Sequence, residues 1–294
     1  MRDLPRRQVP GVYHRRVGEI VLTVLSDGFQ DVSMATVLNI VPEEAAAMMH
    51  AAFRPVPRRT AVNAFLIHSA GRIALVDTGC GTGGQATSGK LAGNLAAAGV
   101  GLAGIDTVLM THLHPDHFGG LAGPGGGAAF PHATLWLSDA EYRYWHDDEA
   151  ANAVADLARR ALFFGGARNS LLPYAGRIER FEGEREVFPG VTALPLPGHT
   201  PGHTGYHIRS AGQELLIWGD IVHVQELQVA RPEVSMAVDV AREPCIATRR
   251  GILQRAARER LTVAGMHLHF PAIANIAEGG QGFTLLPEAW LLEL

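Results

Sequence analysis

Cysteine is nearly absent from the sequence. Only Cys80 and Cys245 occur among its 294 residues. Two cysteines are too few for a disulfide framework or for a zinc site made of four thiolates, while one bridge between the two stays an open alternative. The chain is therefore neither a disulfide-rich scaffold nor a four-cysteine zinc fold.

An excess of positive charge is missing as well. Lysine and arginine number 25 against 29 aspartate and glutamate residues, which gives a formal net charge of −4 and a pI of about 6.4. Nucleic-acid-binding proteins usually carry a basic surface that neutralises phosphates. The composition therefore disfavours a nucleic-acid partner and favours a small neutral or mildly polar substrate.

Long hydrophobic runs are also absent. No stretch of about 18 uncharged apolar residues, the length that a transmembrane helix needs, occurs anywhere in the chain. The first ten residues, MRDLPRRQVP, contain arginines but no apolar segment of the kind found in secretory signals. We therefore expect a soluble, cytoplasmic protein with no membrane partner.

What the chain does contain is enough apolar material for a substantial core. Hydrophobic residues make up 47% of it and charged residues only 18%. Its 34 glycines and 17 prolines indicate many loops between short elements. Because no low-complexity linker divides the sequence, we expect one domain over residues 1–294, with an N-terminal extension of about residues 1–17.

Short apolar runs bounded by turn residues predict strands in both halves of the chain. The predicted strands are residues 20–25, 62–67, 73–76, 107–110, 191–196, 204–208, 214–218 and 261–264. A turn at Ser26-Asp27-Gly28 should end the first strand, and Ser69-Ala70-Gly71 should form a hairpin. Helices are predicted at residues 42–53, 90–98, 139–146, 151–164 and 243–260. This order favours two packed sheets with helices outside.

The densest group of chemically active side chains follows the strand predicted at residues 107–110. Residues 111–120 read THLHPDHFGG and hold four potential metal ligands, namely His112, His114, Asp116 and His117. Pro115 should interrupt a helix, and burying so many polar groups on a strand would be costly. We therefore predict a loop in which these side chains converge, against the alternative of a polar surface loop.

Three later segments also end a predicted strand with a ligand-type residue. They carry His199 after a glycine, Asp220 after Trp-Gly, and His267 after Gly-Met. Each alone could simply satisfy backbone groups, because polar side chains at strand ends often do so. Together with the HxHxDH run they form a coherent set of seven donors.

Seven donors can hold two divalent ions. We expect one ion on His112, His114 and His199, a second on Asp116, His117 and His267, and Asp220 bridging both. Imidazole and carboxylate favour Zn²⁺, with Mn²⁺, Co²⁺ or Fe²⁺ as alternatives. Ions about 3.5 to 4 Å apart with open positions can share a hydroxide, which we predict to be the nucleophile. Asp116 and Asp220 are the predicted catalytic carboxylates.

These motifs resemble the metallo-β-lactamase superfamily over about residues 11–287. The resemblance rests on the HxHxDH run, the later Gly-His, the strand-end aspartate, the final histidine, and Asp77 within the sequence VDTG. It implies an α/β fold, the αββα sandwich, in which two mixed sheets are flanked by helices and the metals lie at one edge. It also implies that Asp77 orients ligands rather than binding metal itself.

Within the superfamily, the chain looks most similar to the methyl parathion hydrolase-like branch, which borders the quorum-quenching lactonases. The stretches that carry this likeness are residues 18–28, 62–66, 111–120, 163–166, 198–204 and 264–271. The likeness implies a dinuclear hydrolase of esters, lactones or phosphotriesters that acts as a homodimer. It also implies that Trp145 and Phe163 or Phe164 wall the substrate pocket, although these aromatics could equally be helix core.

Other residues refine this expectation. The loop at residues 81–88 is rich in Gly, Thr and Ser where organophosphate-active relatives carry an aromatic residue, so we expect esters or lactones first and phosphotriesters second. His223 either lines the pocket or is a satisfied, partly buried histidine. His203 and His269 adjoin predicted ligands and are expected to pack or hydrogen-bond. The arginine-rich residues 249–260 are expected to be a solvated helix face.

Specific residues disfavour other members of the superfamily. A β-lactamase of the commonest zinc type would carry Cys where Asp220 stands, and a flavodiiron protein would carry Glu where His114 stands. Glyoxalase II would add a helical domain after the last ligand and the RNA-processing nucleases would add substrate arms, and we expect neither feature here. A non-catalytic metal- or ligand-binding protein would be indicated by a lost ligand, and none is lost.

Overall fold

The computed structural model describes residues 4–5, 8–280 and 282–294. Residues 12–181 build a seven-stranded sheet. Its strands, in spatial order, are β1 (Val12–Val17), β2 (Ile20–Val32), β4 (Arg58–Ser69), β5 (Arg72–Val76), β6 (Thr107–Leu109), β7 (Thr134–Ser138) and β8 (Ile178–Phe181). Pairing is antiparallel from β1 to β5 and parallel from β5 to β8. Residues 12–17, assigned to an N-terminal extension from the sequence, thus form an edge strand.

Residues 185–287 build another seven-stranded sheet. Its spatial order is β16 (Gly282–Pro287), β15 (Ile273–Gly279), β14 (Thr262–Ala264), β12 (Gln213–Ile217), β11 (Thr204–Ser210), β10 (Val191–Pro195) and β9 (Arg185–Phe188). Only the pairing of β12 with β14 is parallel among the described strands of this sheet. A small sheet joins β3 (Val37–Leu38) to β13 (Ser235–Met236).

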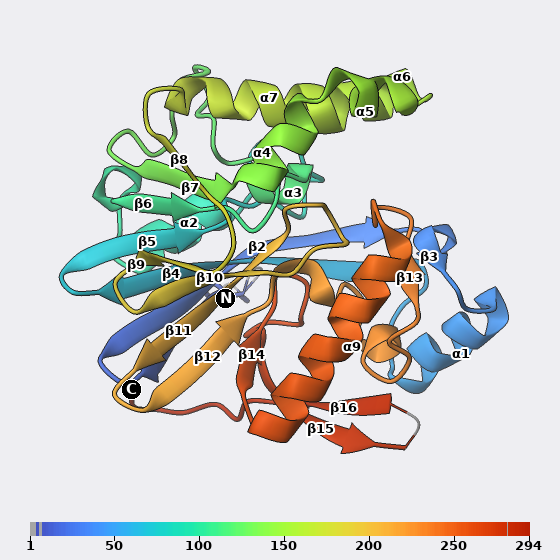
Figure 1. Cartoon of the computed structure of the whole chain (residues 1–294). Coiled ribbons are helices and arrows are strands. Elements are labelled where there is room, and N and C mark those ends of the chain that lie inside the picture. The colour runs from blue at the N-terminus through green and yellow to red at the C-terminus, as the bar shows by residue number, and fades with distance from the viewer. Residues whose placement is uncertain (1–3, 6–7, 281) are drawn as a thin grey trace.

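Helices cover the outer faces of the two large sheets. The α-helices are α1 (Pro42–Ala51), α2 (Leu91–Ala97), α3 (Pro115–Phe118), α4 (Asp139–His146), α5 (Asp148–Ala153), α6 (Leu157–Arg160), α7 (Gly166–Leu171), α8 (Gln225–Gln228) and α9 (Arg242–Glu259). Figure 1 shows α4 to α7 beyond the first sheet and α9 against the second. The predicted αββα sandwich is confirmed. None of the described helices is both long enough and apolar enough to cross a bilayer.

The central strand β4 shows why the apolar runs are continuous rather than alternating. Phe65 and Ile67 pack in the core between the sheets, whereas Ala64 and Leu66 pack in the core beneath the outer helices. Successive side chains of a strand point to opposite faces, so a strand covered on both faces must be apolar at every position. This double burial confirms the strand predicted at residues 62–67.

The strand predicted at residues 20–25 is longer than expected. No turn forms at Ser26-Asp27-Gly28; β2 instead continues to Val32, with a shift of register between Ser26 and Gly28. Gly28 has φ +106°, a conformation that suits the β-bulge and that other residues rarely adopt. The bulge leaves the Asp27 carboxylate free to accept hydrogen bonds from the backbone N–H groups of Cys80, Gly89 and Leu91.

The continuous helix predicted at residues 151–164 is also wrong. The chain forms α5, then α6, then a π-helical turn at Ala161–Gly165. Asp156 caps α6 by accepting hydrogen bonds from the backbone N–H groups of Ala158 and Arg159, so a new helix starts there. By contrast, the predicted hairpin at Ser69-Ala70-Gly71 is confirmed, because positive φ angles at Ala70 and Gly71 form a two-residue connection.

Short helical turns complete the secondary structure. They are 3₁₀ turns at Met34–Thr36, Leu102–Gly104, Leu172–Tyr174 and Gly219–Ile221. The last of these follows β12 directly and contains Asp220. Asp220 is therefore held in a tight turn close to the end of a strand.

Candidate metal centre

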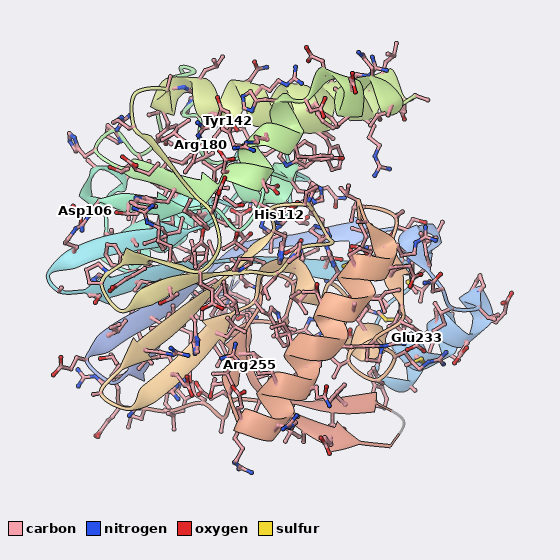
Figure 2. All side chains as sticks on the ribbon, viewed as in Figure 1. Asp106, His112, Tyr142, Arg180, Glu233 and Arg255 are labelled. Atoms are coloured by element: carbon pink, nitrogen blue, oxygen red, sulfur yellow. The ribbon has the colours of Figure 1, made fainter. Side chains whose placement is uncertain are left out.

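The predicted donors lie where strands of both sheets end. His112 and His114 follow β6, His199 follows β10, Asp220 follows β12, and His267 follows β14. Figure 2 shows His112 in the interior of the molecule, whereas Asp106 and Glu233 lie at its periphery. Two sheets packed face to face thus bring donors that are distant in the sequence to one place.

Asp116 and His117 lie in helix α3 rather than in a loop. The expectation that Pro115 would prevent a helix is wrong, because Pro115 is the first residue of α3 and His114 is its N-cap. A proline at this position lacks only an N–H group that has no partner within the helix. The short turn directs the side chains of Asp116 and His117 toward the other donors.

One group of three imidazoles meets at close range. Nε2 of His199 lies 3.2 Å from Nε2 of His112 and 2.9 Å from Nδ1 of His114. The other nitrogen of His199, Nδ1, lies 2.8 Å from the carboxylate of Asp239, to which it donates. The lone pair on Nε2 of His199 therefore faces the two other rings, which is the arrangement of a metal site.

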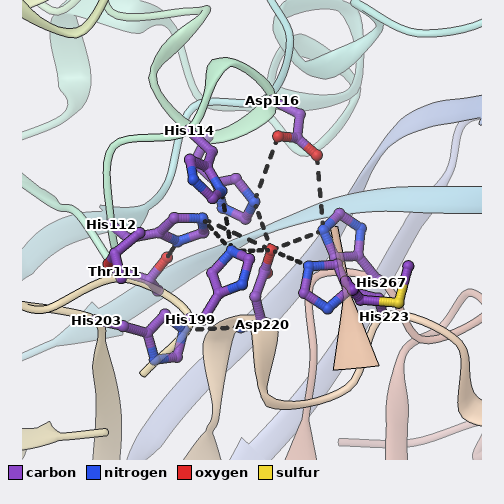
Figure 3. A network of polar contacts seen from close by, with 12 residues as sticks. Thr111, His112, His114, Asp116, His199, His203, Asp220, His223 and His267 are labelled. Atoms are coloured by element: carbon purple, nitrogen blue, oxygen red, sulfur yellow. Dashed lines mark hydrogen bonds and ion pairs between the residues drawn. The ribbon is translucent and has the colours of Figure 1, made fainter. Parts of the chain in front are cut away.

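Asp220 lies at the middle of the cluster (Figure 3). Its Oδ2 atom lies 3.0 Å from Nε2 of His267, 3.1 Å from His223, 3.3 Å from His117, 3.5 Å from His199 and 3.6 Å from His112. Asp116 approaches from the side, with its oxygen atoms 3.8 Å from His117 and 3.6 Å from His267. The structure thus brings together all seven donors predicted from the sequence.

Burial and mutual attraction set the protonation of the cluster. Burial lowers the pKa of His112 and of His114 well below its usual value, so both rings are neutral. Burial alone would raise the pKa of Asp220, but His117 and the other surrounding histidines lower it well below its usual value. Burial opposes protonation of His117 and His267, but the carboxylates of Asp220 and Asp116 raise the pKa of both rings above the usual value. Because a divalent ion binds neutral imidazoles and ionised carboxylates, ion binding would release the protons of these two rings.

Unpaired polar atoms show that the residues fit metal ions. Nε2 of His117 and Oδ1 of Asp220 are buried without a hydrogen-bond partner, although buried polar groups normally have one. The donor atoms of His112, His114 and His199 lie within 4.8 Å of one another, as do those of Asp116, His117 and His267. Two adjacent sets of imidazole and carboxylate donors without a thiolate suit Zn²⁺ or a similar ion.

A cavity of about 120 Å³ opens onto this cluster. Its lining residues are Gln30, Val32, Arg58, Thr60, Val62, His114, Asp116, Phe163, Asp220, His223, Val238 and His267. Of the predicted pocket residues, Phe163 and His223 are part of this wall. Trp145 and Phe164 are buried and line a smaller neighbouring cavity of about 60 Å³, which Phe163 and His114 also border.

A model of the metallo-beta-lactamase superfamily matches residues 57–270, more than half of the chain. The chain belongs to this superfamily. The matched segment contains every predicted donor, and the resemblance inferred from the motifs is confirmed. The two-sheet sandwich described above is therefore the fold of the metallo-beta-lactamase superfamily, and all the predicted donors lie in its matched segment.

Curated relatives share part of the sequence. An N-acyl homoserine lactonase from Bacillus sp is 33% identical over 96 residues, which cover 33% of this chain and 30% of the relative. An N-acyl homoserine lactonase from Bacillus cereus is 30% identical over 110 residues, which cover 37% of this chain and 35% of the relative. The matched segments thus span about a third of each relative.

Solved structures match almost the whole chain. The hydrolase AbOPH superposes with a TM-score of 0.90 and 28% identity, over 97% of this chain and 100% of its own. AidC, a dizinc quorum-quenching lactonase crystallised with N-hexanoyl-L-homoserine, gives a TM-score of 0.89 and 23% identity, over 96% and 99%. The likeness to AidC shows the common fold.

Asp77 supports the superfamily's histidine run from beneath, as the resemblance implied. Its Oδ1 accepts a hydrogen bond from the backbone N–H of Thr111 at 2.8 Å. Its Oδ2 lies 2.7 Å from the hydroxyl of Thr111 and 2.7 Å from Nδ1 of His117. These contacts fix the His117 ring so that its Nε2 atom faces the cluster.

Glu141 joins the two loops that carry the histidines, and the sequence analysis missed it. Its Oε1 accepts hydrogen bonds from the backbone N–H of Leu113 at 2.8 Å and from the indole of Trp145 at 2.6 Å. Its Oε2 accepts from the hydroxyl of Thr200 at 2.6 Å and from the N–H of Gly202 at 3.0 Å. Burial raises the pKa of Glu141, although these donors oppose the shift.

His203 supports Asp220 instead of joining the donor cluster. Its Nε2 accepts a hydrogen bond from the backbone N–H of Asp220 at 2.9 Å, and its Nδ1 lies 2.8 Å from the carbonyl oxygen of Leu196. Gly219, with φ +60°, permits this approach, because a Cβ atom there would lie 2.4 Å from Nε2 of His203. His269, two residues after the donor His267, lies outside the cluster and pairs with Glu226 at 2.5 Å.

Arg249 contradicts the expectation that residues 249–260 form a solvated face. Its side chain is fully buried, and its guanidinium donates to the carbonyl oxygens of Ile221, Pro232 and Val234 at 2.6 to 3.0 Å. A buried guanidinium is tolerated when its donors are satisfied in this way. Arg249 therefore ties α9 to the loop that follows Asp220.

The two cysteines, Cys80 and Cys245, are both free and buried.

Proposed function

We propose that the chain is a metal-dependent hydrolase that holds two divalent ions, with Zn²⁺ the first candidate, and cleaves the ester or lactone bond of a small molecule. The observation that carries the proposal is the convergence of buried imidazoles on Asp220 beside a cavity. The assignment is His112, His114 and His199 for one ion, Asp116, His117 and His267 for the other, and Asp220 for both.

The residues around the cavity have separable roles in this reaction. Bound divalent ions would supply a hydroxide nucleophile near neutral pH and polarise the carbonyl oxygen of the substrate. Asp220 keeps its negative charge at the centre of the cluster. Asp116 is partly exposed at the cavity wall, where its carboxylate would hold an ion and could orient the attacking water. Phe163 and Val238 exclude bulk water from the apolar side of the cavity.

Esters and lactones are the favoured substrates because two curated relatives are named N-acyl homoserine lactonases. Phosphotriesters are the second candidate. The observation in their favour is the Phe163 ring, which stands 5.1 Å from the ring of His114 and offers a flat apolar wall for an aryl leaving group. The predicted homodimer stays a prediction, to be checked by the mass of the protein in solution.

The test combines metal content with activity. Protein grown in zinc or manganese should bind about two ions per chain and hydrolyse members of a panel of aryl esters, acyl-homoserine lactones and methyl parathion. His114→Ala and Asp220→Ala should lower kcat/KM about 1,000-fold or more, because they remove donors at the reacting centre. Chelation should abolish activity reversibly, and cobalt or manganese should restore it.

Matched controls are available on the surface. His50→Ala in α1 and Asp148→Ala in α5 remove the same side-chain types at exposed positions and should leave activity unchanged. Circular dichroism should show that all four variants keep the fold. Fewer than one ion per chain, or full activity of Asp220→Ala, would refute the proposal. Two ions without turnover of any panel member would favour a non-catalytic binding protein.

A further inference from the structure

Arg58 is a buried cation without an ionic partner. It is the first residue of β4 and only 5% exposed. Its guanidinium donates to the hydroxyl groups of Thr60 and Thr36, the latter at 3.1 Å, and its Nε–H has no acceptor. No carboxylate of the described part of the chain forms an ion pair with it, whereas the neighbouring Arg59 pairs with Asp31 at 3.3 Å.

Such a group is costly unless something compensates its charge. Burial lowers the pKa of Arg58 to about 10, so the side chain is still a cation at neutral pH. Two hydroxyl groups satisfy hydrogen bonds but do not offset a buried positive charge. The carboxylate whose charge acts on Arg58 is Asp116. A metal ion on Asp116 would take up that negative charge and leave Arg58 without compensation.

The position of Arg58 indicates what would compensate it. Arg58 lines the same cavity as Asp116, Asp220 and His267. Gln30 and Thr60 extend this polar part of the wall, while the remaining wall away from the donor cluster and His223 is made of valines and Phe163. A ligand in the cavity therefore meets the metal donors on one side and a guanidinium on another.

We propose that Arg58 binds a carboxylate of the substrate, so that the preferred substrates are esters or lactones that carry an anionic group besides the bond to be cleaved. A guanidinium matches a carboxylate in charge and in the spacing of its donors. The inference rests on the proposed function and deepens it by naming the substrate class. A substrate of this class supplies the negative charge that the protein itself does not place beside Arg58.

A matched pair of substrates and a matched pair of variants test the inference. Mono-4-nitrophenyl adipate and 4-nitrophenyl hexanoate differ only in a terminal carboxylate. With the metal-loaded protein, and with uncatalysed hydrolysis subtracted, Arg58→Met should lower kcat/KM for the adipate ester about 10- to 100-fold, mainly through KM. The hexanoate ester should change less than about 3-fold. Arg59→Met makes the same change at the exposed neighbour and should affect neither ester.

Further variants separate recognition from structure. Arg58→Lys keeps the charge without the forked geometry and should fall between the wild type and Arg58→Met. Arg58→Gln keeps hydrogen-bond donors for Thr36 and Thr60 but loses the charge, and it replaces Arg58→Met if that variant does not fold. An equal loss of kcat/KM on both esters would overturn the inference and make Arg58 a structural tie between β4 and the Thr36 turn.

Binding of non-reacting anions distinguishes failure of this inference from failure of the proposed function. Calorimetry on the metal-loaded protein should show adipate binding about 10- to 100-fold more tightly than hexanoate, and Arg58→Met should abolish the difference. This readout needs no hydrolysis. If no ester is cleaved but the preference for adipate disappears in Arg58→Met, the hydrolase proposal fails and the role of Arg58 stands. Equal binding of both anions by the wild type would overturn the role of Arg58.

Discussion

Oδ1 of Asp239 lies 2.8 Å from Nδ1 of His199, and this contact determines which nitrogen of the imidazole faces the donor cluster. The carboxylate accepts the Nδ1 proton, so the lone pair is on Nε2. Asp239 is itself fixed by the backbone N–H of Met236, which donates to Oδ2 at 2.7 Å. Neighbouring groups of this kind commonly tune the affinity of a metal ligand.

Removing the Asp239 carboxylate should therefore weaken metal binding. We expect Asp239→Ala to lower the affinity for Zn²⁺ about 10- to 100-fold, because His199 loses the group that fixes its tautomer. Asp239→Asn, which retains an acceptor oxygen, should lose less. Competition with a chromophoric chelator measures both variants, with the exposed Asp148→Ala as control. An unchanged dissociation constant for Asp239→Ala would contradict this role.

The Glu141 carboxylate should stabilise the fold as well as the site. Glu141→Ala leaves four donors, from Leu113, Trp145, Thr200 and Gly202, without their acceptor. Because each buried donor left unpaired costs about 1–3 kcal/mol, we expect a loss of about 3 kcal/mol or more in the free energy of unfolding. Urea denaturation measures it. Glu182→Ala, at a position 77% exposed, should change stability by less than about 0.5 kcal/mol.

Two adjacent arginines of α9 should differ sharply in their effect on stability. Arg249→Met leaves the carbonyl oxygens of Ile221, Pro232 and Val234 without a donor and should cost about 3 kcal/mol. Arg250→Met removes a side chain that is 58% exposed and should cost less than about 0.5 kcal/mol. Thermal and urea unfolding compare them. If Arg249→Met lowered the free energy of unfolding by no more than about 0.5 kcal/mol, the contacts of Arg249 would contribute little to stability.

The two thiols should be unreactive in the native protein. Burial raises the pKa of Cys80 and of Cys245 from 9.0 to about 12, so neither forms the nucleophilic thiolate near neutral pH. We expect a disulfide reagent at pH 8 to modify neither thiol in the folded state and both in denaturant. Rapid modification of one equivalent in the native protein would show that one of these side chains is accessible.

The same two thiols give the stability a pH dependence with a definite sign. Between pH 9 and about 12 the unfolded chain loses thiol protons that the folded chain retains, so stability falls as the pH rises through this interval. Urea midpoints at pH 8, 9.5 and 10.5 should decrease more in the wild type than in a Cys80→Ala, Cys245→Ala double variant. Parallel curves would assign the decrease to other groups.

The sequence pattern was enough to select these side chains as candidates, because His112, His199, Asp220 and His267 each lie within four residues after a strand. His114, Asp116 and His117 belong to the same short run as His112. In the structure, Nε2 of His112, Nε2 of His199 and Oδ2 of Asp220 lie 3.2 to 3.6 Å from one another. That these residues hold ions stays a prediction. Asp239 and Arg58 gave no such signal. Their roles come from the distant residues that they meet, and a lone Asp in a loop or Arg on a strand looks like any surface residue.

Errors in the fold had local physical causes. The turn expected at Ser26 is a bulge because Gly28 adopts φ +106° and the chain then resumes its pairing with β4. The helix expected over residues 151–164 breaks because Asp156 caps a new one. Arg249 was placed in solvent because residues 249–260 are rich in arginine, which is typical of a solvated helix face. Pattern alone cannot show that the carbonyl oxygens of a distant loop lie within its reach.

The donor cluster draws on both large sheets, with His112, His114, Asp116 and His117 from the first and His199, Asp220 and His267 from the second. Neither sheet alone supplies all seven donors. An ion that binds the seven assembled donors, but not the donors of either sheet alone, stabilises the packing of the two sheets. Removing the ion should therefore weaken that packing. Ion binding would then stabilise the tertiary structure as well as serve the proposed reaction.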